Sequence, residues 1–396
     1  MKGIQGVNFK GKKVLIRVDF NVPLNHNRQV SDSTRIKESI PTIQKVLEGG
    51  GTVILLSHLG RPKGYENDYS LNPIIPHLTK MLNKNIIFTR ELFGEKTKKV
   101  CADLKPGDVV LLENLRFYPE EEAADEKFAK DLASLGDIYI NDAFATSHRR
   151  HASTAVLAEF FPKDKYFGLL IENEIINIDK ALNNPKKPFT GIIGGSKVSN
   201  KLSILERLLD KVDNLIIGGG MAFTFIKALD GEVGDSLVED EQIQAAKKII
   251  KGAMLNGINM YIPTDVVCAD AFSSEANVRI CPANKIKKGW MGLDIGPVTQ
   301  RRFAEIIGKS ETILWNGPMG VFELPPFKQG TKSVAINVAS ATISGAFSLI
   351  GGGDSVAAIN RYNLADQISY VSTGGGAMLE YIEGRTLPGI AAILED

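Results

Sequence analysis

Arginine, histidine and asparagine side chains stand where the strand-like runs in the first half of the chain end. These runs are VLIRVDFN (14–21), VILLSHLGR (53–61), VVLLENLRF (109–117) and IYINDAFATSHRRH (138–151). Buried parallel strands read as continuous apolar runs, and ligands of open α/β sheets gather at the carboxyl ends of the strands. Because arginine forks at such an edge bind anions, the pattern predicts a site for a small, highly charged anion.

The candidate ligands of this anion lie at or just after the predicted strand ends, except for Arg35 at a helix start. Taken singly, each arginine could be a solvated surface residue and each histidine a capped loop residue, and Asp19 and Asn21 could cap a turn. Several arginines on successive strand ends would repel one another without an anion, so we favour a polyanionic ligand. The candidates are Arg17, Asp19, Asn21, Arg35, His58, Arg61, Arg116, Arg149 and His151.

The strand-like runs of the second half end in adjacent glycines instead. These runs are FTGIIGGSK (189–197), NLIIGGG (214–220), FSLIGGGDS (347–355) and ISYVSTGGGA (368–377). Glycines let backbone N–H groups approach a phosphate closely, and a following helix adds its positive end. Helix C-caps and tight turns use the same residue, so one glycine pair alone is a weak signal. Four of them in succession predict a cradle for a nucleotide.

The segment GGSKVSNK (194–201) places Lys197 and Lys201 four residues apart at the start of a helical pattern over 199–210. We expect both ammonium groups to share one face at the positive end of that helix, an arrangement that suits a phosphate. The chain has no intact GxxxxGK[ST] or GxGxxG motif, and Gly308-Lys309-Ser310 is interpreted as a helix end.

The segment GGGDS (351–355) adds a carboxylate beside the predicted cradle. A carboxylate beside nucleotide phosphates most often acts through Mg²⁺, because the phosphates would otherwise repel it. Asp354 could instead be a helix N-cap, and Ser355 could cap the helix. WNGPMGVFE (315–323) ends another strand with Asn316 and Glu323, which are either ribose-hydroxyl partners or turn formers.

Composition describes an ordinary soluble globular protein. Of 396 residues, 43% are hydrophobic and 23% charged, and the formal net charge of +1 excludes the strongly basic profile of a nucleic-acid binder. Three cysteines without CxxC spacing indicate neither a disulfide framework nor a zinc cluster and favour a reducing compartment. The N-terminal segment lacks a signal-like apolar core, and no stretch approaches the roughly 20 apolar residues of a membrane span. We expect a cytoplasmic protein with no nucleic-acid or membrane partner.

Alternating strand and helix patterns predict an α/β fold with two doubly wound parallel-sheet (Rossmann-like) domains joined by a hinge helix. Strands are expected near 13–18, 52–57, 108–112 and 137–140. Helices are expected over 33–48, opening at Ser33 and kinked by Pro41, and over 122–134. A helical pattern over 169–183 runs into NNPKKP (183–188), the best boundary in the chain. The expected domains are 1–168 and 189–374, with 169–188 as hinge and 375–396 returning toward the first domain.

Together these segments resemble the motifs of the phosphoglycerate kinase family, in the same order and over essentially the whole chain. No single motif would suffice, but their shared order excludes chance agreement. The matching segments are RVDFNVP (17–23), SHLGRP (57–62), ENLRF (113–117), NDAFATSHRRHAS (141–153), GGSKVSNK (194–201), GWMGLDIGP (289–297), WNGPMGVFE (315–323), GGGDS (351–355), STGGGA (372–377) and LPG (387–389).

The resemblance implies an ATP:carboxylate phosphotransferase of glycolysis. It implies that 1,3-bisphosphoglycerate and ADP are interconverted with 3-phosphoglycerate and ATP by a monomeric enzyme whose two domains close about a hinge near Glu174. Mg²⁺ would accompany the nucleotide, bound through Asp354. Arg35, Lys197 and the helix starts at Gly352 and Gly375 would stabilise the transferring phosphoryl group.

The same resemblance implies two sets of binding residues. Those for phosphoglycerate are Asp19, Phe20, Asn21, Arg35, His58, Leu59, Gly60, Arg61, Arg116, Arg149 and His151. Those for the nucleotide are Lys197, Lys201, Gly292, Asn316, Glu323, Gly352, Gly353, Asp354 and Ser355.

The sequence departs from the family pattern at a few positions. Ser196 and Asn200 replace the commoner alanine and aspartate around Lys197, and Ser355 stands for the frequent threonine. Ser147 and Arg150 occupy positions where small residues are usual, and Arg150 could compete with Arg149 for the ligand. None of these departures removes a charged catalytic group.

Two other classes of function remain open from the residues alone. A nucleotide-dependent oxidoreductase would carry an acidic strand end about 20 residues past a GxGxxG motif, and that motif is missing. A hinged anion-binding module without catalysis would account for the arginines and the hinge. It would leave Lys197, Lys201 and GGGDS unexplained.

Overall fold

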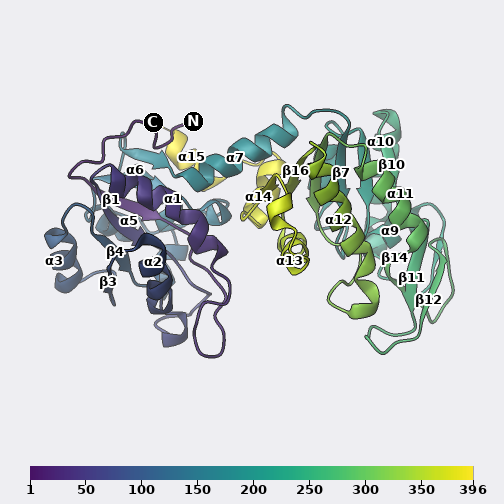
Figure 1. The fold of residues 1–396 in the computed structure, drawn as a ribbon, viewed down its shortest axis with the longest axis horizontal. Helices are drawn as coiled ribbons and strands as arrows, with labels where there is room; N and C mark the ends of the chain where they lie inside the picture. Colours follow the sequence, from purple (N-terminus) through teal and green to yellow (C-terminus); the bar gives the residue numbers. More distant parts are fainter. Residues whose placement is uncertain (396) are drawn as a thin grey trace. The chain divides into compact units, whose positions relative to one another are not determined.

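The computed structural model describes residues 1–395 and divides into two compact units (Figure 1). The first comprises Met1–Ile176 together with the stretch from Arg385 onward, and the second comprises Asn177–Gly384. Each unit contains one six-stranded sheet. No helix among the described residues is long and apolar enough to cross a bilayer.

The sheet of the first unit is parallel throughout and has the order β3-β4-β2-β1-β5-β6. β1 and β5 are neighbours, yet the chain leaves β1 toward β2 and leaves β5 toward β6, in opposite directions across the sheet. Such a divergence is a topological switch point, where open α/β sheets bind ligands. The strands are β1 Lys13–Arg17, β2 Thr52–Leu56, β3 Ile86–Thr89, β4 Val109–Leu112, β5 Ile138–Asn141 and β6 Lys165–Phe167.

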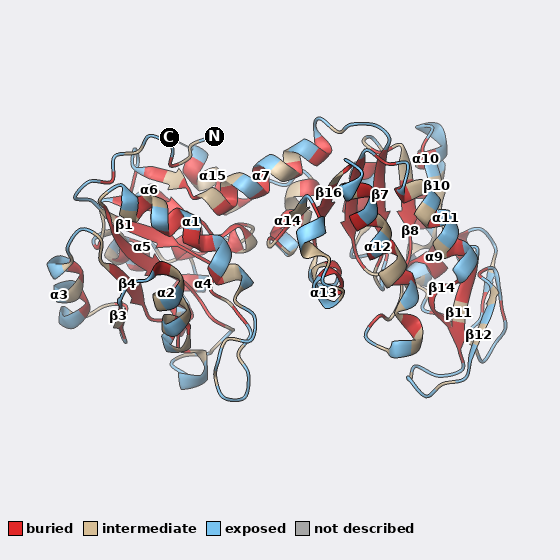
Figure 2. Cartoon of the chain, in the orientation of Figure 1, coloured by how far each residue is buried: buried red, intermediate tan, exposed pale blue. Residues whose placement is uncertain are grey.

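Helices cover this sheet and bury its apolar strands, which are red in Figure 2. Ile36 and Ile43 of α1 join a core cluster with alternate strand residues such as Val14 and Ile16. The helices of the unit are α1 Thr34–Glu48, α2 Ile75–Leu82, α3 Glu95–Asp103, α4 Pro119–Glu122, α5 Glu126–Ala133, a π-helical turn at Ala152–Val156, α6 Leu157–Glu159 and α15 Pro388–Leu394.

The main sheet of the second unit repeats this plan with the order β10-β8-β7-β15-β16-β17, again all parallel. The chain leaves β7 toward β8 and leaves its neighbour β15 toward β16, so the switch point lies between β7 and β15. The strands are β7 Phe189–Ile193, β8 Asn214–Ile217, β10 Asn259–Tyr261, β15 Thr312–Asn316, β16 Phe347–Ile350 and β17 Tyr370–Val371.

The second unit also holds two smaller sheets that the sequence did not predict. One is antiparallel with the order β12-β11-β14, and the other pairs β13 with β9. Their strands are β9 Glu232–Val233, β11 Asp265–Ala269, β12 Val278–Pro282, β13 Lys285–Ile286 and β14 Met291–Ile295. The helices of the unit are α8 Leu202–Leu208, α9 Ala222–Ala228, α10 Ile243–Leu255, α11 Pro297–Ile307, α12 Gln329–Ile343, α13 Gly353–Arg361 and α14 Gly376–Ile382.

One helix, α7 (Leu169–Leu182), contains the boundary between the units, which falls after Ile176. Its first turn is held in the first unit, where the backbone N–H of Leu170 donates to the Asp142 carboxylate at 2.9 Å. Near its other end, the Tyr381 hydroxyl of α14 donates to Asp179 at 3.3 Å within the second unit. These two hydrogen bonds anchor each half of α7 in its own unit. Glu174, between the two anchored parts, is fully buried.

Most of the predicted elements are confirmed, including all four predicted strands of the first unit and the helix at 34–48 with Pro41 inside it. Gly308 ends α11, as expected. The helix expected over 122–134 is confirmed as α5 from Glu126 onward, but its start is wrong, because Ala124 adopts a left-handed backbone (φ +56°) that separates α4 from α5. The short strands β3 and β6 were not predicted.

Candidate functional site

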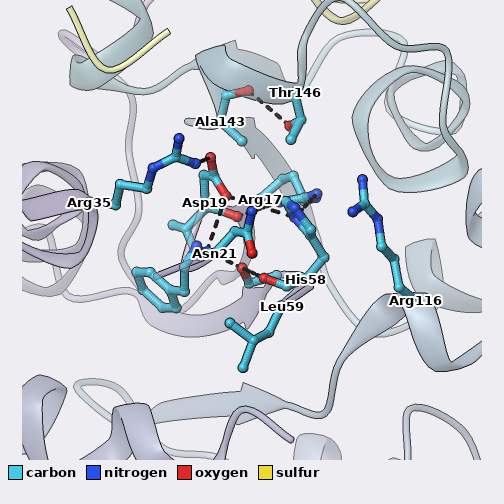
Figure 3. A network of polar contacts seen from close by, with 12 residues as sticks. Arg17, Asp19, Asn21, Arg35, His58, Leu59, Arg116, Ala143 and Thr146 are labelled. Atoms are coloured by element: carbon cyan, nitrogen blue, oxygen red, sulfur yellow. Dashed lines mark hydrogen bonds and ion pairs between the residues drawn. The ribbon is translucent and has the colours of Figure 1, made fainter. Parts of the chain in front are cut away.

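The carboxyl end of β1 carries a buried arginine that other side chains hold in place. The Arg17 guanidinium is inaccessible to solvent and donates through Nε to Ser153 Oγ at 2.7 Å. Its Nη2 lies 3.2 Å from His58 Nδ1, on the loop after β2 (Figure 3). Arg17 therefore positions neighbouring side chains at the edge of the sheet, and its own guanidinium is not exposed to a ligand.

Asp19 organises the residues in front of Arg17 (Figure 3). One carboxylate oxygen pairs with the guanidinium of Arg35, and the other lies 3.8 Å from His58 Nδ1 and accepts the Asn21 N–H at 3.2 Å. The Asn21 side chain in turn accepts the Gly60 N–H at 2.9 Å. The Arg35 side chain stays about one-third exposed, so it can meet a ligand while Asp19 fixes its direction.

The two histidines of this edge are held neutral. Burial lowers the pKa of His58 well below its usual value, and Arg17, Arg116 and Arg35 lower it further. Burial and the charges of Arg116 and Arg17 lower the pKa of His151 to about 4. The nearby guanidiniums disfavour any further positive charge. Each neutral imidazole can still donate one N–H to an anion.

Arg116 extends the cationic edge to the end of β4. Its Nη1 donates to the Gly60 carbonyl at 2.8 Å and its Nε lies 3.2 Å from the Glu122 carboxylate. Arg149 donates through Nε to His148 Nε2 at 3.2 Å. Arg116 and Arg149 both lower the pKa of His151, which places their charges near that imidazole.

A buried carboxylate beneath these cations compensates part of their charge. Glu121 is inaccessible to solvent and accepts hydrogen bonds from the Ser153 N–H at 2.9 Å and the Ser153 hydroxyl at 2.6 Å. Burial raises the pKa of Glu121, and the charge of Arg17 opposes that shift. The His151 Nδ1 is buried and lacks a hydrogen-bond partner among the described residues, 4.0 Å from Glu121. This orphaned nitrogen fits a site completed by a ligand.

Some predicted ligands of this edge have structural roles. The Phe20 side chain lies in the hydrophobic core, and the Leu59 side chain is also buried. The Leu59 backbone already bonds the Asn114 amide. Arg61 is exposed and makes no hydrogen bond or ion pair within residues 1–395. Arg150 pairs with Glu159 at 3.5 Å, so its side chain is engaged apart from Arg149.

The C-terminal stretch closes on the same unit at Ser147, one of the unusual positions. The Gly389 N–H donates to the Ser147 carbonyl at 2.8 Å, and Asn141 Nδ2 donates to the Gly389 carbonyl at 3.0 Å. A Cβ on Gly389 would lie 2.9 Å from the Ser147 Cα. The LPG segment therefore fastens the chain beside the end of β5.

The second unit has a cavity of about 470 Å³ at its glycine-rich edge. A volume of this size suits a small organic ligand. Three predicted nucleotide ligands, Gly292, Glu323 and Asp354, lie in its wall. The wall also includes Gly195, Ser196, Gly219, Gly220, Phe223, Leu237, Val266, Met291, Leu293 and Met319. It thus combines apolar side chains with glycine backbone, which suits a flat base and its attached phosphates.

Gly292 illustrates why the cavity requires glycine. A Cβ at this position would lie 2.1 Å from the Phe223 ring. Its N–H is already fixed by the Ser236 hydroxyl at 2.9 Å. The ring and the backbone are therefore in direct contact, and any side chain would displace the aromatic wall.

The expected position of the two lysines on one helix face is wrong. α8 begins at Leu202, so Lys201 is its N-cap and Lys197 lies in the preceding loop. Glu239 holds this loop by accepting from the Ser199 N–H and hydroxyl at 3.0 and 2.6 Å. The Lys197 side chain is exposed, whereas the Lys201 ammonium donates to Asn316 Oδ1. Burial lowers the pKa of Lys201.

The first turn of α13 also differs from the sequence interpretation. Gly352, not Asp354 or Ser355, is the N-cap, with a left-handed φ of +91°. Ser355 is buried and its hydroxyl accepts the Gly317 N–H at 2.6 Å. The Asp354 carboxylate lines the cavity and makes no hydrogen bond or ion pair within residues 1–395.

The residues present fit a magnesium ion that arrives with a nucleotide. Within residues 1–395, no three His, Cys, Asp or Glu side chains gather as a metal site. Mg²⁺ characteristically takes one or two carboxylates together with water and substrate phosphates. The Asp354 carboxylate in the cavity wall, which makes no hydrogen bond or ion pair within residues 1–395, can supply one such ligand.

The remaining nucleotide candidates lie in the same unit but not in the cavity wall. Asn316 ends β15 fully buried, and its Nδ2 donates to the Gly351 carbonyl at 2.6 Å while its Oδ1 accepts from Lys201. Its side chain thus ties β15 to the loop after β16. Gly353 is exposed, and Gly375 caps α14 with a φ of +53°.

Sequence reasoning missed three groups that shape these sites. Glu121 lies in a run of three glutamates that reads as a solvated surface. Ser153 ends the segment NDAFATSHRRHAS (141–153), and its place in that segment was the only sequence signal, because its side chain is small and uncharged. The aromatic wall at Phe223 carries no local signal, because Phe223 is an ordinary apolar residue of a helix.

Comparisons with known proteins agree with this architecture. The model of the family described as phosphoglycerate kinase matches residues 4–385. "Phosphoglycerate kinase" of Porphyromonas gingivalis is 48% identical, covering 98% of this chain and 99% of that protein. "Phosphoglycerate kinase 3, cytosolic" of Arabidopsis thaliana is 49% identical, covering 99% and 98%.

Solved structures give the same result. The structure of phosphoglycerate kinase from Coxiella burnetii superposes with a TM-score of 0.90 at 41% identity, covering 99% of this chain and 98% of that one. The enzyme from Pyrococcus horikoshii OT3 gives 0.84 at 30% identity, with 100% and 98% covered. The two-unit α/β fold with two parallel six-stranded sheets is the fold of these proteins. The chain belongs to the phosphoglycerate kinase family and is a kinase, a phosphate-transferring enzyme.

Proposed function

We propose that this protein transfers the acyl phosphate of 1,3-bisphosphoglycerate to Mg-ADP, giving 3-phosphoglycerate and ATP, and catalyses the reverse reaction, as a step of glycolysis. The observation that carries the proposal is the chemical contrast between the two switch points. One is lined by guanidinium and imidazole groups, the other by glycine backbone beside an apolar cavity. A polyanionic acid suits the first, and a nucleotide suits the second.

The acid substrate is held by the first unit. Arg35, directed by Asp19, and the neutral imidazoles of His58 and His151 face an anion that supplies the missing negative charge. In the reverse direction, the attacking carboxylate is already ionised, so no residue has to act as a general base.

The nucleotide is held by the second unit. The base enters the cavity against Phe223, and the phosphates lie at the glycine-rich helix starts of α13 and α14. Asp354 would hold Mg²⁺ together with the nucleotide, and that ion would supply positive charge to the phosphates. Lys197, whose side chain is exposed and makes no hydrogen bond within residues 1–395, donates to the transferring phosphoryl group.

Transfer follows from positioning and charge neutralisation. Because the substrates bind to different units, we propose that closure about α7 precedes transfer and excludes water. Arg35 and Lys197 then lie on either side of the phosphoryl group while it is transferred. The protein acts as a cytoplasmic monomer in this account.

A coupled assay of ATP formation from 1,3-bisphosphoglycerate and ADP tests the proposal. We expect ATP to form only when Mg²⁺ is present and activity to vanish on chelation. Calorimetry should detect Mg-ADP binding and no response to NAD. Absence of ATP formation by a protein that binds both substrates would contradict the proposed reaction.

A further inference from the structure

Two of the three cysteines lie side by side on neighbouring strands of the second unit. β11 and β12 pair antiparallel with Val266 opposite Cys281. Cys268 is two residues beyond Val266, so its side chain projects from the same face as Cys281. The two Sγ atoms are 2.7 Å apart, compared with about 2.05 Å in a disulfide. The three cysteines are free thiols, and their spacing in the sequence gave no sign that two of them lie next to each other.

The two thiols differ in their access to solvent. Cys268 is fully buried in a cluster with Phe223 and Val266. Cys281 is only partly buried and lies on β12, the edge strand of the sheet β12-β11-β14. A small oxidant therefore reaches Cys281 first, with Cys268 directly behind it as the second sulfur.

The surroundings favour this order of reaction. Burial and the neighbouring Cys281 raise the pKa of the Cys268 thiol, and the charge of Arg279 opposes that shift. Arg279 lies opposite Cys268 on β12, with its guanidinium 3.8 Å from the centre of the Trp290 ring. Its Nε is buried without a hydrogen-bond partner among the described residues. A fixed positive charge beside a thiol pair assists thiolate formation.

We propose that Cys268 and Cys281 are a redox-modification site that a hydroperoxide converts to a reversible disulfide. The Cys281 thiol releases its proton, the thiolate attacks one oxygen of hydrogen peroxide and the O–O bond breaks; the leaving hydroxide takes up that proton, so a sulfenic acid and one water form. The Cys268 sulfur then attacks the sulfenic sulfur, the S–S bond forms and a second water leaves. The two thiols lose two electrons and two protons, which reduce the peroxide to two waters.

The position of the pair links it to the cavity in the same unit. Cys268 lies opposite Gly292 of β14 and two residues from Val266, and both of these residues line the cavity. A bond between β11 and β12 therefore restrains one wall of that cavity. Cys101 is buried in α3 of the first unit and takes no part.

Thiol counting by mass spectrometry tests the proposal on the full chain. Protein treated with hydrogen peroxide is unfolded in iodoacetamide, and the added carbamidomethyl groups are counted and mapped. Reduced protein should gain three groups, one for each cysteine. Oxidised protein should gain one, at Cys101, and dithiothreitol should restore all three. Amide exchange over 266–281 should become slower on oxidation.

Two variants control the result. Peroxide-treated Cys101→Ser should gain no group, since its only cysteines are linked. Cys281→Ser should keep a labelled Cys268 and show no loss that dithiothreitol reverses. If Cys281→Ser does not fold, Cys268→Ala is the control: its Cys281 should form a sulfenic acid that dimedone traps, and no disulfide within the chain should form. Retention of three labelled thiols, a loss that dithiothreitol cannot reverse, or disulfides only between separate chains would overturn the proposal.

Discussion

The two units share one sheet plan but prepare their switch points differently. In the first unit, side chains do the work: Arg17 and Arg35 are held by Ser153 and Asp19, and buried carboxylates balance them. In the second, glycine backbone and an apolar cavity form the edge, and side chains such as Asn316 and Ser355 hold that backbone in place. The charged side chains of the first unit have to be held in position before the ligand binds. The glycine backbone of the second unit needs the absence of side chains that would fill the site.

The two edges should therefore be sensitive to different substitutions and conditions. The charged edge depends on charge balance, so it should respond to pH and to removal of single cations. The glycine edge depends on left-handed backbone and on the absence of Cβ atoms, so it should respond to added methyl groups. Single substitutions and changes of pH can separate the dependence on charge balance from the dependence on missing Cβ atoms.

Arg35→Ala should produce the largest loss, a fall in kcat of about 10²–10³-fold, because one cation at developing charge is worth about that factor. Steady-state kinetics with both substrates measure it. The melting temperature should change little, since the Asp19–Arg35 pair is partly exposed. Unchanged kcat with weaker phosphoglycerate binding would show that Arg35 only binds.

Acid should weaken the first unit more than the second. All five histidines belong to the first unit. The pKa of His151 is about 4 in the folded protein and 6.5 when unperturbed, so the unfolded state binds the extra proton between these values. The contribution of His151 to stability is therefore full above pH 6.5 and falls by up to about 3 kcal/mol toward pH 4.

Chemical denaturation at pH 7 and pH 4.5 measures this loss, and amide exchange locates it. His151→Gln should lose less stability between the two pH values than the natural protein. His26→Gln, at an exposed loop residue, should behave as the natural protein does. Equal acid sensitivity of the two units would contradict the charge-balance account.

Gly352→Ala should damage the glycine edge, whereas Gly353→Ala should not. Position 352 has a φ of +91°, and a Cβ there would lie 2.3 Å from Asn316 Nδ2. Position 353 has ordinary φ, and a Cβ added there would meet no atom within 4 Å. We expect a stability loss of about 1–3 kcal/mol and weaker Mg-ADP binding for Gly352→Ala. Calorimetry and thermal unfolding compare the pair, and equal behaviour would refute the backbone account.

Arg61→Ala should have the smallest effect. Its side chain is exposed and makes no hydrogen bond or ion pair within residues 1–395, so stability should change by less than about 0.5 kcal/mol. Phosphoglycerate affinity should fall by at most about tenfold, the effect of one solvated charge. A larger loss, measured by calorimetry, would mean that Arg61 closes over the ligand.

The central strands β2, β4, β5, β7 and β15 could be predicted from the sequence because they are buried on both faces and read as continuous apolar runs. The short strand β3, IIFT, is half-buried, and its apolar run is only three residues long. The antiparallel sheet was missed for a related reason. In β12, Val278 and Ile280 are exposed while Arg279 and Cys281 are partly buried, which inverts the usual alternation of an amphipathic strand.

The sequence predicted those residues of the candidate site that lie at or just after the ends of strands. The bonds that organise it join distant residues, as in Arg17 with Ser153 or Lys201 with Asn316. Such pairs leave no local pattern. The start of α8 was misplaced because the Glu239 carboxylate, far along the chain, holds the preceding loop out of the helix.

The central claim is that each unit binds one substrate at its own switch point. Amide exchange with single ligands tests it most directly. 3-Phosphoglycerate alone should slow exchange over 17–21, 58–61 and 149–154, and Mg-ADP alone should slow it over 194–201, 291–295 and 351–356. Protection of the glycine-rich segments by 3-phosphoglycerate, or of the arginine-bearing segments by Mg-ADP, would contradict the account.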